Sequence, residues 1–203
     1  MSLYSRHILP TLIDFAMKRD ELSGLRSASI PFARGVVVEI GIGSGLNLPF
    51  YSASVTKLYG VDPSAELLAR ARPRAEHVPF PVEFLRQDAQ RMALADGTAD
   101  TIVMTWSLCS VGDPACALRE LHRVLKPGGV FIFVEHGLAP DERVRRWQNR
   151  LTPAWRRAAG GCHLNRKIDD LIQSAGFTIT ELHAGYIPGP RVAAYTYNGR
   201  ATL

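Results

Sequence analysis

The sequence predicts a doubly wound α/β fold, in which helices cover both faces of a mostly parallel sheet. Short β-branched or apolar runs alternate with helical patterns from about residue 35 to about residue 135, which is the pattern of such a fold. The run at 130–134 is continuously apolar, as expected for a strand buried on both faces. A glycine-rich segment at 41–45 follows the first strand, where doubly wound folds carry a ligand-binding loop.

The boundaries of the elements follow from local signals. Asp62-Pro63-Ser64 is typical of a helix start, and Lys126-Pro127-Gly128-Gly129 is a cluster that ends a helix. We expect strands over residues 36–40, 57–62, 82–85, 100–105 and 130–134, and later strands near 177–183 and 191–197. We expect helices over residues 9–21, 64–71, 115–125 and 167–174, and a basic helical stretch that includes residues 144–158.

Length and composition indicate one globular domain over residues 1–203. With 46% hydrophobic and 21% charged residues, the chain does not resemble a disordered, fibrous or membrane-spanning protein. Its net charge of +5 favours anionic partners slightly without requiring nucleic acid. We divide the domain into an N-terminal helical lid (1–34), a cofactor-binding core (35–135), a second helical lid (136–175) and C-terminal strands (176–203).

The three cysteines and the N-terminal segment indicate in which cellular compartment the protein is expected. The cysteines are odd in number and lack the spacing of a zinc knuckle or a redox pair, so we expect no metal and a reduced chain. The first ten residues lack the pattern of a secretory signal, and no apolar run reaches the length of a membrane span. We therefore expect a cytoplasmic protein, with peripheral contact at the inner face of a membrane as an additional hypothesis.

The glycine loop indicates which ligands are unsuitable. Glu39-Ile40-Gly41-Ile42-Gly43-Ser44-Gly45 lies where a strand turns into a helix, so glycines can bring the backbone close to a ligand. A dinucleotide fingerprint requires a glycine where Leu46 or Leu48 stands in the two registers. A phosphate-binding P-loop requires a following Gly-Lys-Ser/Thr, which is also missing. Neither dinucleotides nor nucleoside triphosphates suit this loop.

S-adenosylmethionine fits the loop and the acids that follow it. Its methionine end carries one carboxylate and one ammonium, and Glu39 adds negative charge beside the ammonium and the sulfonium. Asp62, after the second strand, can accept both ribose hydroxyls, and Asp88, after the third, can accept the adenine amino group. The alternative is a tight turn with two helix caps. The residues expected to bind the cofactor are Glu39, Gly41, Gly43, Gly45, Asn47, Asp62, Pro63, Asp88, Ala89, Thr105 and Trp106.

These segments resemble the class I S-adenosylmethionine-dependent methyltransferases of the type 11 group. The resemblance is carried by VEIGIGSG at 38–45, GVDPS at 60–64, QDA at 87–89, DTIV at 100–103 and RVLKPGG at 123–129. It implies a Rossmann-like, seven-stranded sheet with an antiparallel last strand. It also implies methyl transfer from S-adenosylmethionine, with S-adenosylhomocysteine as the product.

A narrower resemblance extends to the C-terminal part of the chain. WSLCSV at 106–111, FVEH at 133–136, WQ at 147–148, PAW at 153–155 and GCHLNR at 161–166 are similar to segments of thiol S-methyltransferases and their bacterial relatives. Some of those relatives are named phosphatidylethanolamine N-methyltransferases. The vertebrate thiol enzymes carry an apolar N-terminal membrane anchor, which the sequence does not predict here, so membrane residence is not implied.

Catalysis would mainly require alignment of the acceptor and exclusion of water, because the displacement discharges a sulfonium. Glu135-His136 ends the most apolar strand, so we assign His136 as a candidate general base and Glu135 as its orienting or charge partner. The alternative is a structural histidine at the end of a strand.

The acceptor pocket is expected to involve side chains from two loops and the basic helix. Cys109 is assigned as an apolar wall rather than a nucleophile, and Cys162-His163 as structural or pocket-lining rather than a catalytic dyad. Residues assigned to the pocket are Cys109, Trp147, Trp155 and His163.

The basic stretch and the N-terminal helix leave two interpretations open. Val144, Trp147, Leu151, Trp155 and Ala158 form an apolar strip among six arginines, which Pro153 would kink or split. The strip could cover the site and contact anionic lipid, or pack its tryptophans on the core. The N-terminal helix would complete the lid, with Tyr4 and Arg26 reaching the pocket.

The function expected from the sequence is methyl transfer to a small, lipophilic acceptor such as a thiol. Phospholipid N-methylation is the alternative, and RNA methylation or a non-catalytic regulator is less favoured. Thr105-Trp106-Ser107-Leu108 replaces the Asn/Asp-Pro-Pro-Tyr/Phe motif of base-amine methylases, so nucleic acid is not an expected partner. The assembly is expected to be a monomer or a homodimer.

Overall fold

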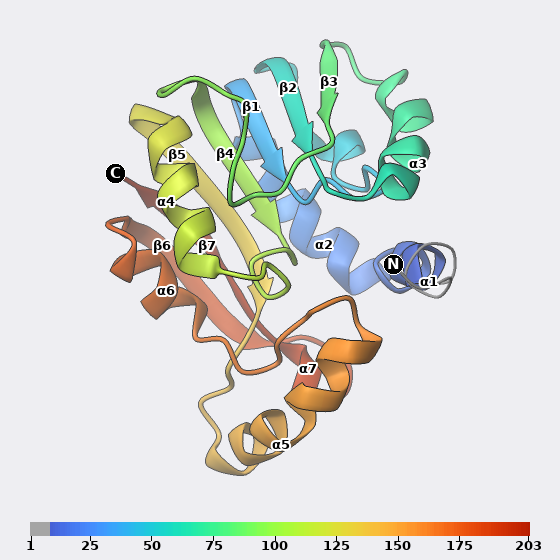
Figure 1. The fold of residues 1–203 in the computed structure, drawn as a ribbon, viewed down its shortest axis with the longest axis vertical. Coiled ribbons are helices and arrows are strands. Elements are labelled where there is room, and N and C mark those ends of the chain that lie inside the picture. The colour runs from blue at the N-terminus through green and yellow to red at the C-terminus, as the bar shows by residue number, and fades with distance from the viewer. Residues whose placement is uncertain (1–8) are drawn as a thin grey trace.

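The computed structural model describes residues 9–203, which form one seven-stranded sheet flanked by helices (Figure 1). The predicted reach of Tyr4 to the pocket lies outside the described residues. The strands are β1 (Gly35–Ile40), β2 (Val55–Val61), β3 (Val82–Leu85), β4 (Ala99–Thr105), β5 (Leu125–His136), β6 (Thr178–Tyr186) and β7 (Tyr195–Thr202). The helices are α1 (Leu9–Ala16), α2 (Asp20–Ser29), α3 (Ala65–Ala75), α4 (Pro114–Val124), α5 (Glu142–Ala158), α6 (Ile168–Ser174) and α7 (Arg191–Ala194).

The strand order is β3-β2-β1-β4-β5-β7-β6. Strands β1 to β5 pair in parallel with their neighbours, whereas β7 runs antiparallel to both β5 and β6. The order changes direction at β1, and ligands of doubly wound sheets bind at such a switch point. The predicted fold class, including the antiparallel last strand, is confirmed.

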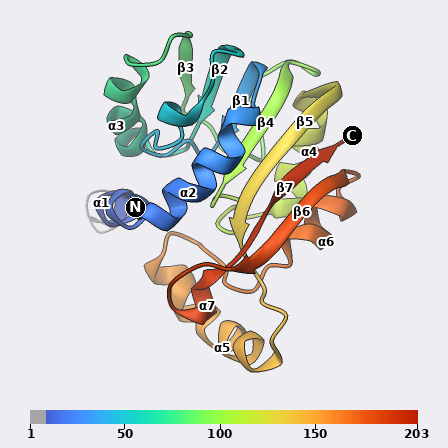
Figure 2. The ribbon, with the colours of Figure 1, turned by 180° about the vertical axis from the view of Figure 1, so that it is seen from behind.

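The central strands are buried on both faces because helices cover both sides. Val38 and Phe131 pack in one hydrophobic cluster with Leu121 of α4, whereas their chain neighbours Val37 and Ile132 pack in a second cluster. Alternate residues of a strand point to opposite faces, so the two clusters lie on opposite sides of the sheet. Figure 1 shows α4 and α6 on one face, and Figure 2 shows α2 lying across the other.

Strand β5 begins earlier than predicted. Its pairing with β4 shifts between Ala99, opposite Leu125, and Thr101, opposite Val130. The four residues between Leu125 and Val130 form an irregularity, and Gly128 within it has φ 75°. Helix α4 ends at Val124, just before the breaker cluster, and strand pairing begins at once with Leu125. The cluster therefore lies inside β5 as an irregularity.

The last strand lies later than predicted, over 195–202 instead of 191–197, because Pro190 is followed by the single helical turn α7. Gly199 resembles a turn residue in the sequence but lies inside β7. A Cβ atom there would come within 2.1 Å of the Glu181 carbonyl oxygen, so the close approach of β6 explains the glycine.

The N-terminal region contains two helices where one, over residues 9–21, is predicted. The chain leaves α1 at Ala16 and begins α2 at Asp20, with Asp20 and Glu21 in the first turn, where acidic side chains favour the helix dipole. Arg26 of α2 donates from Nη1 to the Met17 carbonyl oxygen at 2.9 Å. This contact fixes the break between the helices.

Helix α5 is not split at Pro153, and it packs by a different face from the predicted one. Val144, Gln148 and Thr152 are the buried side chains, whereas Trp147 and Trp155 are 49% and 40% exposed. The tryptophans are therefore not packed into the core. Helix α5 lies beyond the end of the sheet where β4 and β5 finish (Figure 1).

Gln148 attaches α5 to the rest of the fold. Its Oε1 atom accepts from the Ala139 amide at 3.0 Å, and its Nε2 atom donates to the carbonyl oxygens of Gly137 (2.9 Å) and Val192 (3.1 Å). A buried amide that satisfies three backbone groups explains why a polar side chain occupies the packed face. Across residues 9–203, none of the helices has the length and apolar character needed to cross a bilayer.

Candidate active site

A cleft of about 380 Å³ opens at the carboxyl ends of β1, β2 and β4, a volume within the usual range for small-molecule sites. The glycine loop after β1 forms its floor. Gly41 has φ 68°, and a Cβ atom there would lie 2.0 Å from Ser107 Oγ. Only glycine fits this position, because both the backbone angle and the approach of the β4 loop exclude a side chain.

Asp62 connects the glycine loop to the start of α3. Its Oδ2 atom accepts from the Gly43 amide at 3.0 Å, and its Oδ1 atom accepts from the Ser64 amide at 2.8 Å. Burial raises the pKa of Asp62 above its ordinary value against the effect of these two amides. The carboxylate still lines the cleft, so its remaining lone pairs face the ligand space.

A chain of polar side chains lies under the cleft. Arg26 Nε donates to Asn47 Oδ1 at 3.0 Å, and Asn47 Nδ2 donates to Glu39 Oε1 at 2.8 Å and to Thr105 Oγ1 at 3.0 Å. The Tyr51 hydroxyl donates to Glu39 Oε2 at 2.8 Å. Arg26, Asn47, Glu39 and Thr105 all line the cleft, which confirms the expectation that Arg26 reaches the pocket.

Burial shifts the ionisation of both charged members of this chain. It raises the pKa of Glu39 to about 7, opposed by the hydrogen bonds from Tyr51 and Asn47 and by the charge of Arg26. It also lowers the pKa of Arg26 to about 10, opposed by Glu39. One buried cation and one buried acid therefore stand on two sides of Asn47, an arrangement that suits a ligand bearing both charges.

Ten of the eleven predicted cofactor residues line the cleft, including Pro63, Asp88 and Ala89. Asp88 Oδ1 accepts from the Gln90 amide and from Gln90 Nε2, each at 2.9 Å, so the acid is positioned by its own turn. Gly45 is the exception. Its φ is 79°, and a Cβ atom would lie 2.8 Å from Leu48 Cδ1, so Gly45 serves the packing of the loop.

Trp106 has an unusual backbone conformation. Of the non-glycine residues that the structure describes, Trp106 alone has a positive φ, of 48°. Its amide donates to the Val134 carbonyl oxygen at 2.7 Å. The Arg26 guanidinium carbon lies 4.8 Å from the centroid of its ring, within the range of a cation–π contact. Trp106 also lines the cleft, so its ring forms part of the wall next to Arg26.

Glu135 holds the loop after β4. Its Oε1 atom accepts from the amides of Ser107 (2.7 Å) and Leu108 (2.8 Å), and its Oε2 atom accepts from the amide of Cys109 (3.3 Å). Burial raises its pKa to about 7 against the effect of these amides. The hydrogen bonds of its carboxylate go to the amides of this loop, so the geometry gives it a positioning role.

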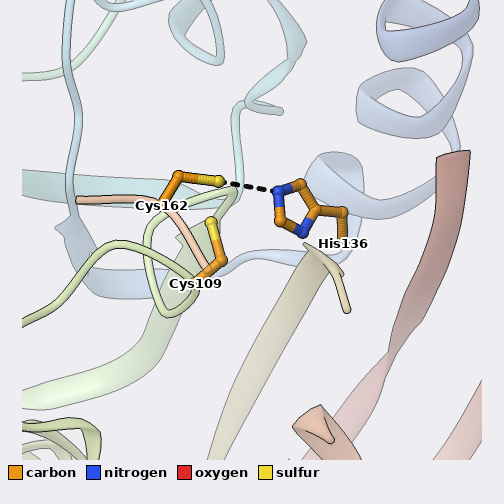
Figure 3. Close-up of side chains that lie close together, drawn as sticks. All are labelled: Cys109, His136 and Cys162. Atoms are coloured by element: carbon orange, nitrogen blue, oxygen red, sulfur yellow. Dashed lines mark hydrogen bonds between the residues drawn. The ribbon is translucent and has the colours of Figure 1, made fainter. Parts of the chain in front are cut away.

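His136 contacts a cysteine. Its Nε2 atom lies 2.8 Å from Cys162 Sγ (Figure 3). In addition, Trp155 Nε1 donates to Cys162 Sγ at 3.3 Å. Burial lowers the pKa of His136, but the contact with Cys162 outweighs it and leaves that pKa above its ordinary value. Hydrogen bonding with Cys109 and His136 lowers the pKa of Cys162.

The predicted acceptor and catalytic residues do not line the cleft. Within residues 9–203, the lining includes Ser110 and Gly160 but none of Cys109, Trp147, Trp155, His163, Glu135 or His136. His163 instead donates its amide to the Cys109 carbonyl oxygen at 2.8 Å. Sequence reasoning missed Tyr51 and Gln148, because a tyrosine after a Pro-Phe pair and a glutamine among arginines carry no local signal of burial.

Comparisons with known proteins agree with this arrangement. The methyltransferase domain family matches residues 38–133. A thiol S-methyltransferase of Rattus norvegicus is 32% identical over 169 residues, which cover 81% of this chain and 69% of that protein. A phosphatidylethanolamine N-methyltransferase of Cereibacter sphaeroides is 40% identical over 129 residues, which cover 62% of this chain and 63% of that protein.

Solved structures with a similar fold also include methyltransferases. An S-adenosylmethionine-dependent methyltransferase from Mesorhizobium loti superposes with a TM-score of 0.66 at 21% identity, covering 92% of this chain and 99% of that one. Both the sequence relatives and the glycine loop with its acids therefore lead to one assignment. The chain belongs to the S-adenosylmethionine-dependent methyltransferases, in the type 11 methyltransferase domain family.

Proposed function

We propose that this enzyme transfers a methyl group to a small lipophilic acceptor, with a thiol as the first candidate. The observation that carries the proposal is the composition of the cleft beyond the polar chain. Ile13 of α1 and Met17 just after that helix line it, together with Trp106 and Val111 from the loop after β4. Apolar walls favour a soft or lipophilic group over a strongly hydrated one.

The polar chain fits the methionine end of the cofactor. That end carries a carboxylate and an ammonium, and the cleft offers Arg26 to the first and Glu39 to the second, with Asn47 hydrogen-bonded to both. Asp62 would accept the ribose hydroxyls, and Asp88 the adenine amino group. S-adenosylmethionine, when bound, supplies a methyl group made electrophilic by its sulfonium.

The remaining task of the chain is to align the acceptor and exclude water. In the lining formed by residues 9–203 there is no histidine or lysine, so the acceptor benefits from ionising by itself. A thiol with a pKa of about 8.5 is roughly 3% thiolate at neutral pH, whereas an alkylamine with a pKa of about 10.4 is neutral in fewer than about one molecule in a thousand. This difference favours a thiol acceptor.

The assignment of His136 as general base, with Glu135 as its partner, stays a prediction. A base acting through a bound water is compatible with apo geometry, but the imidazole contacts Cys162 and does not line the cleft. The proposed transfer does not depend on it.

The test is a labelled-methyl assay after calorimetric titration with S-adenosylmethionine. Alkyl thiols, phenols, phosphatidylethanolamine vesicles and bulk RNA are offered separately to the same preparation. We expect cofactor binding and label in the alkyl thiol product. Label in RNA or phenols with none in thiols would contradict the proposal, as would cofactor binding without transfer to any acceptor offered.

Phosphatidylethanolamine is the second candidate, and the exposed apolar side chains of α1 and α5 favour it. Leu12 and Phe15 of α1 are 51% and 79% exposed, as are Trp147 and Leu151 of α5 at 49% and 38%. Arginines surround those of α5, and basic amphipathic helices bind anionic membrane surfaces. Label in the lipid arm of the same assay would select this candidate and a peripheral membrane location.

A further inference from the structure

Three soft side chains meet behind the wall of the cleft, although they come from three different segments. Cys109 lies in the loop after β4, His136 is the last residue of β5, and Cys162 lies between α5 and α6. Their ligand atoms all lie within 4.8 Å of one another. Figure 3 shows the two sulfur atoms and the imidazole turned toward one another.

The backbones that carry these side chains are fixed independently. Glu135 holds the Cys109 amide, and the Cys109 carbonyl oxygen accepts from the His163 amide at 2.8 Å. His136 is paired in the sheet with Thr196 of β7. The Cys162 amide donates to the Ala159 carbonyl oxygen at 3.2 Å. Each of the three backbones is therefore held by contacts other than those among the three side chains, as a preformed site requires.

The packing of the cluster is not that of an ordinary hydrophobic core. Cys109 and Cys162 are 2% and 8% exposed, and both are free thiols. In the part of the chain that the structure describes, His136 Nδ1 is buried without a hydrogen-bond partner. Trp155 directs its indole N–H at Cys162 Sγ, a contact that stabilises a thiolate.

We propose that Cys109, His136 and Cys162 form a binding site for a thiophilic metal ion such as Zn²⁺. Two sulfurs and one imidazole are the ligands of Zn²⁺ and related ions, whereas Mg²⁺ and Ca²⁺ require oxygen. With Zn–S bonds of about 2.3 Å, two sulfurs on a tetrahedral ion lie about 3.8 Å apart. A sulfur and an imidazole nitrogen on the same ion lie about 3.5 Å apart. Binding therefore requires side-chain rotations that lengthen the 2.8 Å contact between His136 Nε2 and Cys162 Sγ, while the other donor separations stay within the 4.8 Å limit.

The ion would connect the two loops that border the acceptor side of the cleft. Ser110 and Gly160, which line the cleft, lie within two residues of Cys109 and Cys162 along the chain. Three protein ligands also leave a fourth position open on a tetrahedral ion. The site is distinct from the cofactor residues and does not depend on the identity of the acceptor.

The test measures metal binding directly. Reduced, chelator-treated full-length protein is titrated with Zn²⁺ against a chromophoric chelator, and with Co²⁺ to detect thiolate-to-metal charge-transfer absorption. We expect one ion per chain, the cobalt thiolate band, and a Tm that rises with Zn²⁺ because the folded state binds the ion.

Variants assign the ligands. Cys162→Ser and His136→Gln should each weaken Zn²⁺ binding by more than about 100-fold, since loss of an outer partner alone costs about 10- to 100-fold. Cys116→Ser is the matched control, because Cys116 Sγ contacts the Gln90 carbonyl oxygen away from the cluster, and it should bind as the natural protein does. Because Cys109 is deeply buried, Cys109→Ser is informative only if its circular dichroism spectrum matches that of the natural protein. Cys162→Ser and His136→Gln suffice to test the proposed ligands without it.

Two results would overturn the proposal. One is Zn²⁺ affinity that is the same in the natural protein and in Cys162→Ser. The other is a Cys109–Cys162 disulfide, found by peptide mapping after exposure to glutathione disulfide, in a protein whose reduced form takes up no Zn²⁺. That second result would assign the pair to thiol–disulfide exchange.

Discussion

Asp62 and the loop after β4 are held in different ways. On the cofactor side of the cleft, Asp62 accepts from the amides of Ser64 and Gly43, which are 2 and 19 residues away in the chain. On the proposed acceptor side, the loop after β4 is held by Glu135 and by Arg166, whose Nη2 donates to the Val111 carbonyl oxygen from 55 residues away. Asp62 therefore depends on residues near it in the chain, whereas the loop after β4 depends on residues from 26 to 55 positions away.

The largest effect is expected on the acceptor side, at Glu135. Glu135→Ala would leave three buried amides without an acceptor, at about 1 kcal/mol or more each. We expect the free energy of unfolding to fall by about 3 kcal/mol and the Tm by about 10 °C, measured by thermal and urea denaturation. Glu135→Gln, which keeps a carbonyl acceptor, should recover part of this. A Tm within about 2 °C of the natural protein for Glu135→Ala would show that the loop is held by other contacts.

The next largest effect is expected at Asp62, on the cofactor side of the cleft. Asp62→Ala removes an acceptor for two ribose hydroxyls, about 3 kcal/mol at roughly 1.5 kcal/mol each, so affinity for S-adenosylmethionine should fall roughly 100-fold. Calorimetric titration measures it. Glu83→Ala, which removes a half-exposed carboxylate on β3, is the control and should bind normally. Equal affinity in both variants would refute the role of Asp62.

A smaller, pH-dependent effect is expected from Glu39. Its pKa of about 7 in the free protein means that a cationic ligand favours the ionised form. Affinity should therefore fall as the pH drops below 7, by up to about tenfold per pH unit. Arg26, Tyr51 and Asp62 are the other charged or titratable groups that affect this carboxyl.

Titrations between about pH 6 and pH 8 measure this slope, and Glu39→Gln should remove it. The same slope in Glu39→Gln would assign the proton to another group.

The smallest expected effect concerns the exposed face of α5. If that face contacts anionic lipid, Arg150→Gln should weaken binding to anionic vesicles by about 1 kcal/mol, or roughly fivefold, in a sedimentation assay. Arg119→Gln on α4, also exposed, is the control for net charge. Identical losses in both variants would indicate a general charge effect and remove α5 from the interpretation.

The contrast between contacts near in the chain and contacts distant in the chain also explains which features the sequence predicted and which it did not. The strands up to β5 follow from β-branched runs, and the glycine loop, Asp62 and Asp88 follow from spacing, because each depends on neighbours in the chain. Gly199, Gln148 and the exposed tryptophans of α5 depend on what packs against them in space. The cluster of Cys109, His136 and Cys162 has no local spacing signal, since His136 and Cys162 are 26 residues apart.

The left-handed backbone of Trp106 sets a conformational cost against the shape of the cleft. A bulky residue at φ 48° costs about 1–2 kcal/mol relative to a relaxed conformation, a cost that glycine would avoid. Glycine would also remove the ring that lies beneath Arg26 and lines the cleft. The strain at this position is therefore coupled to the wall that the tryptophan supplies, and relieving the one would open the other.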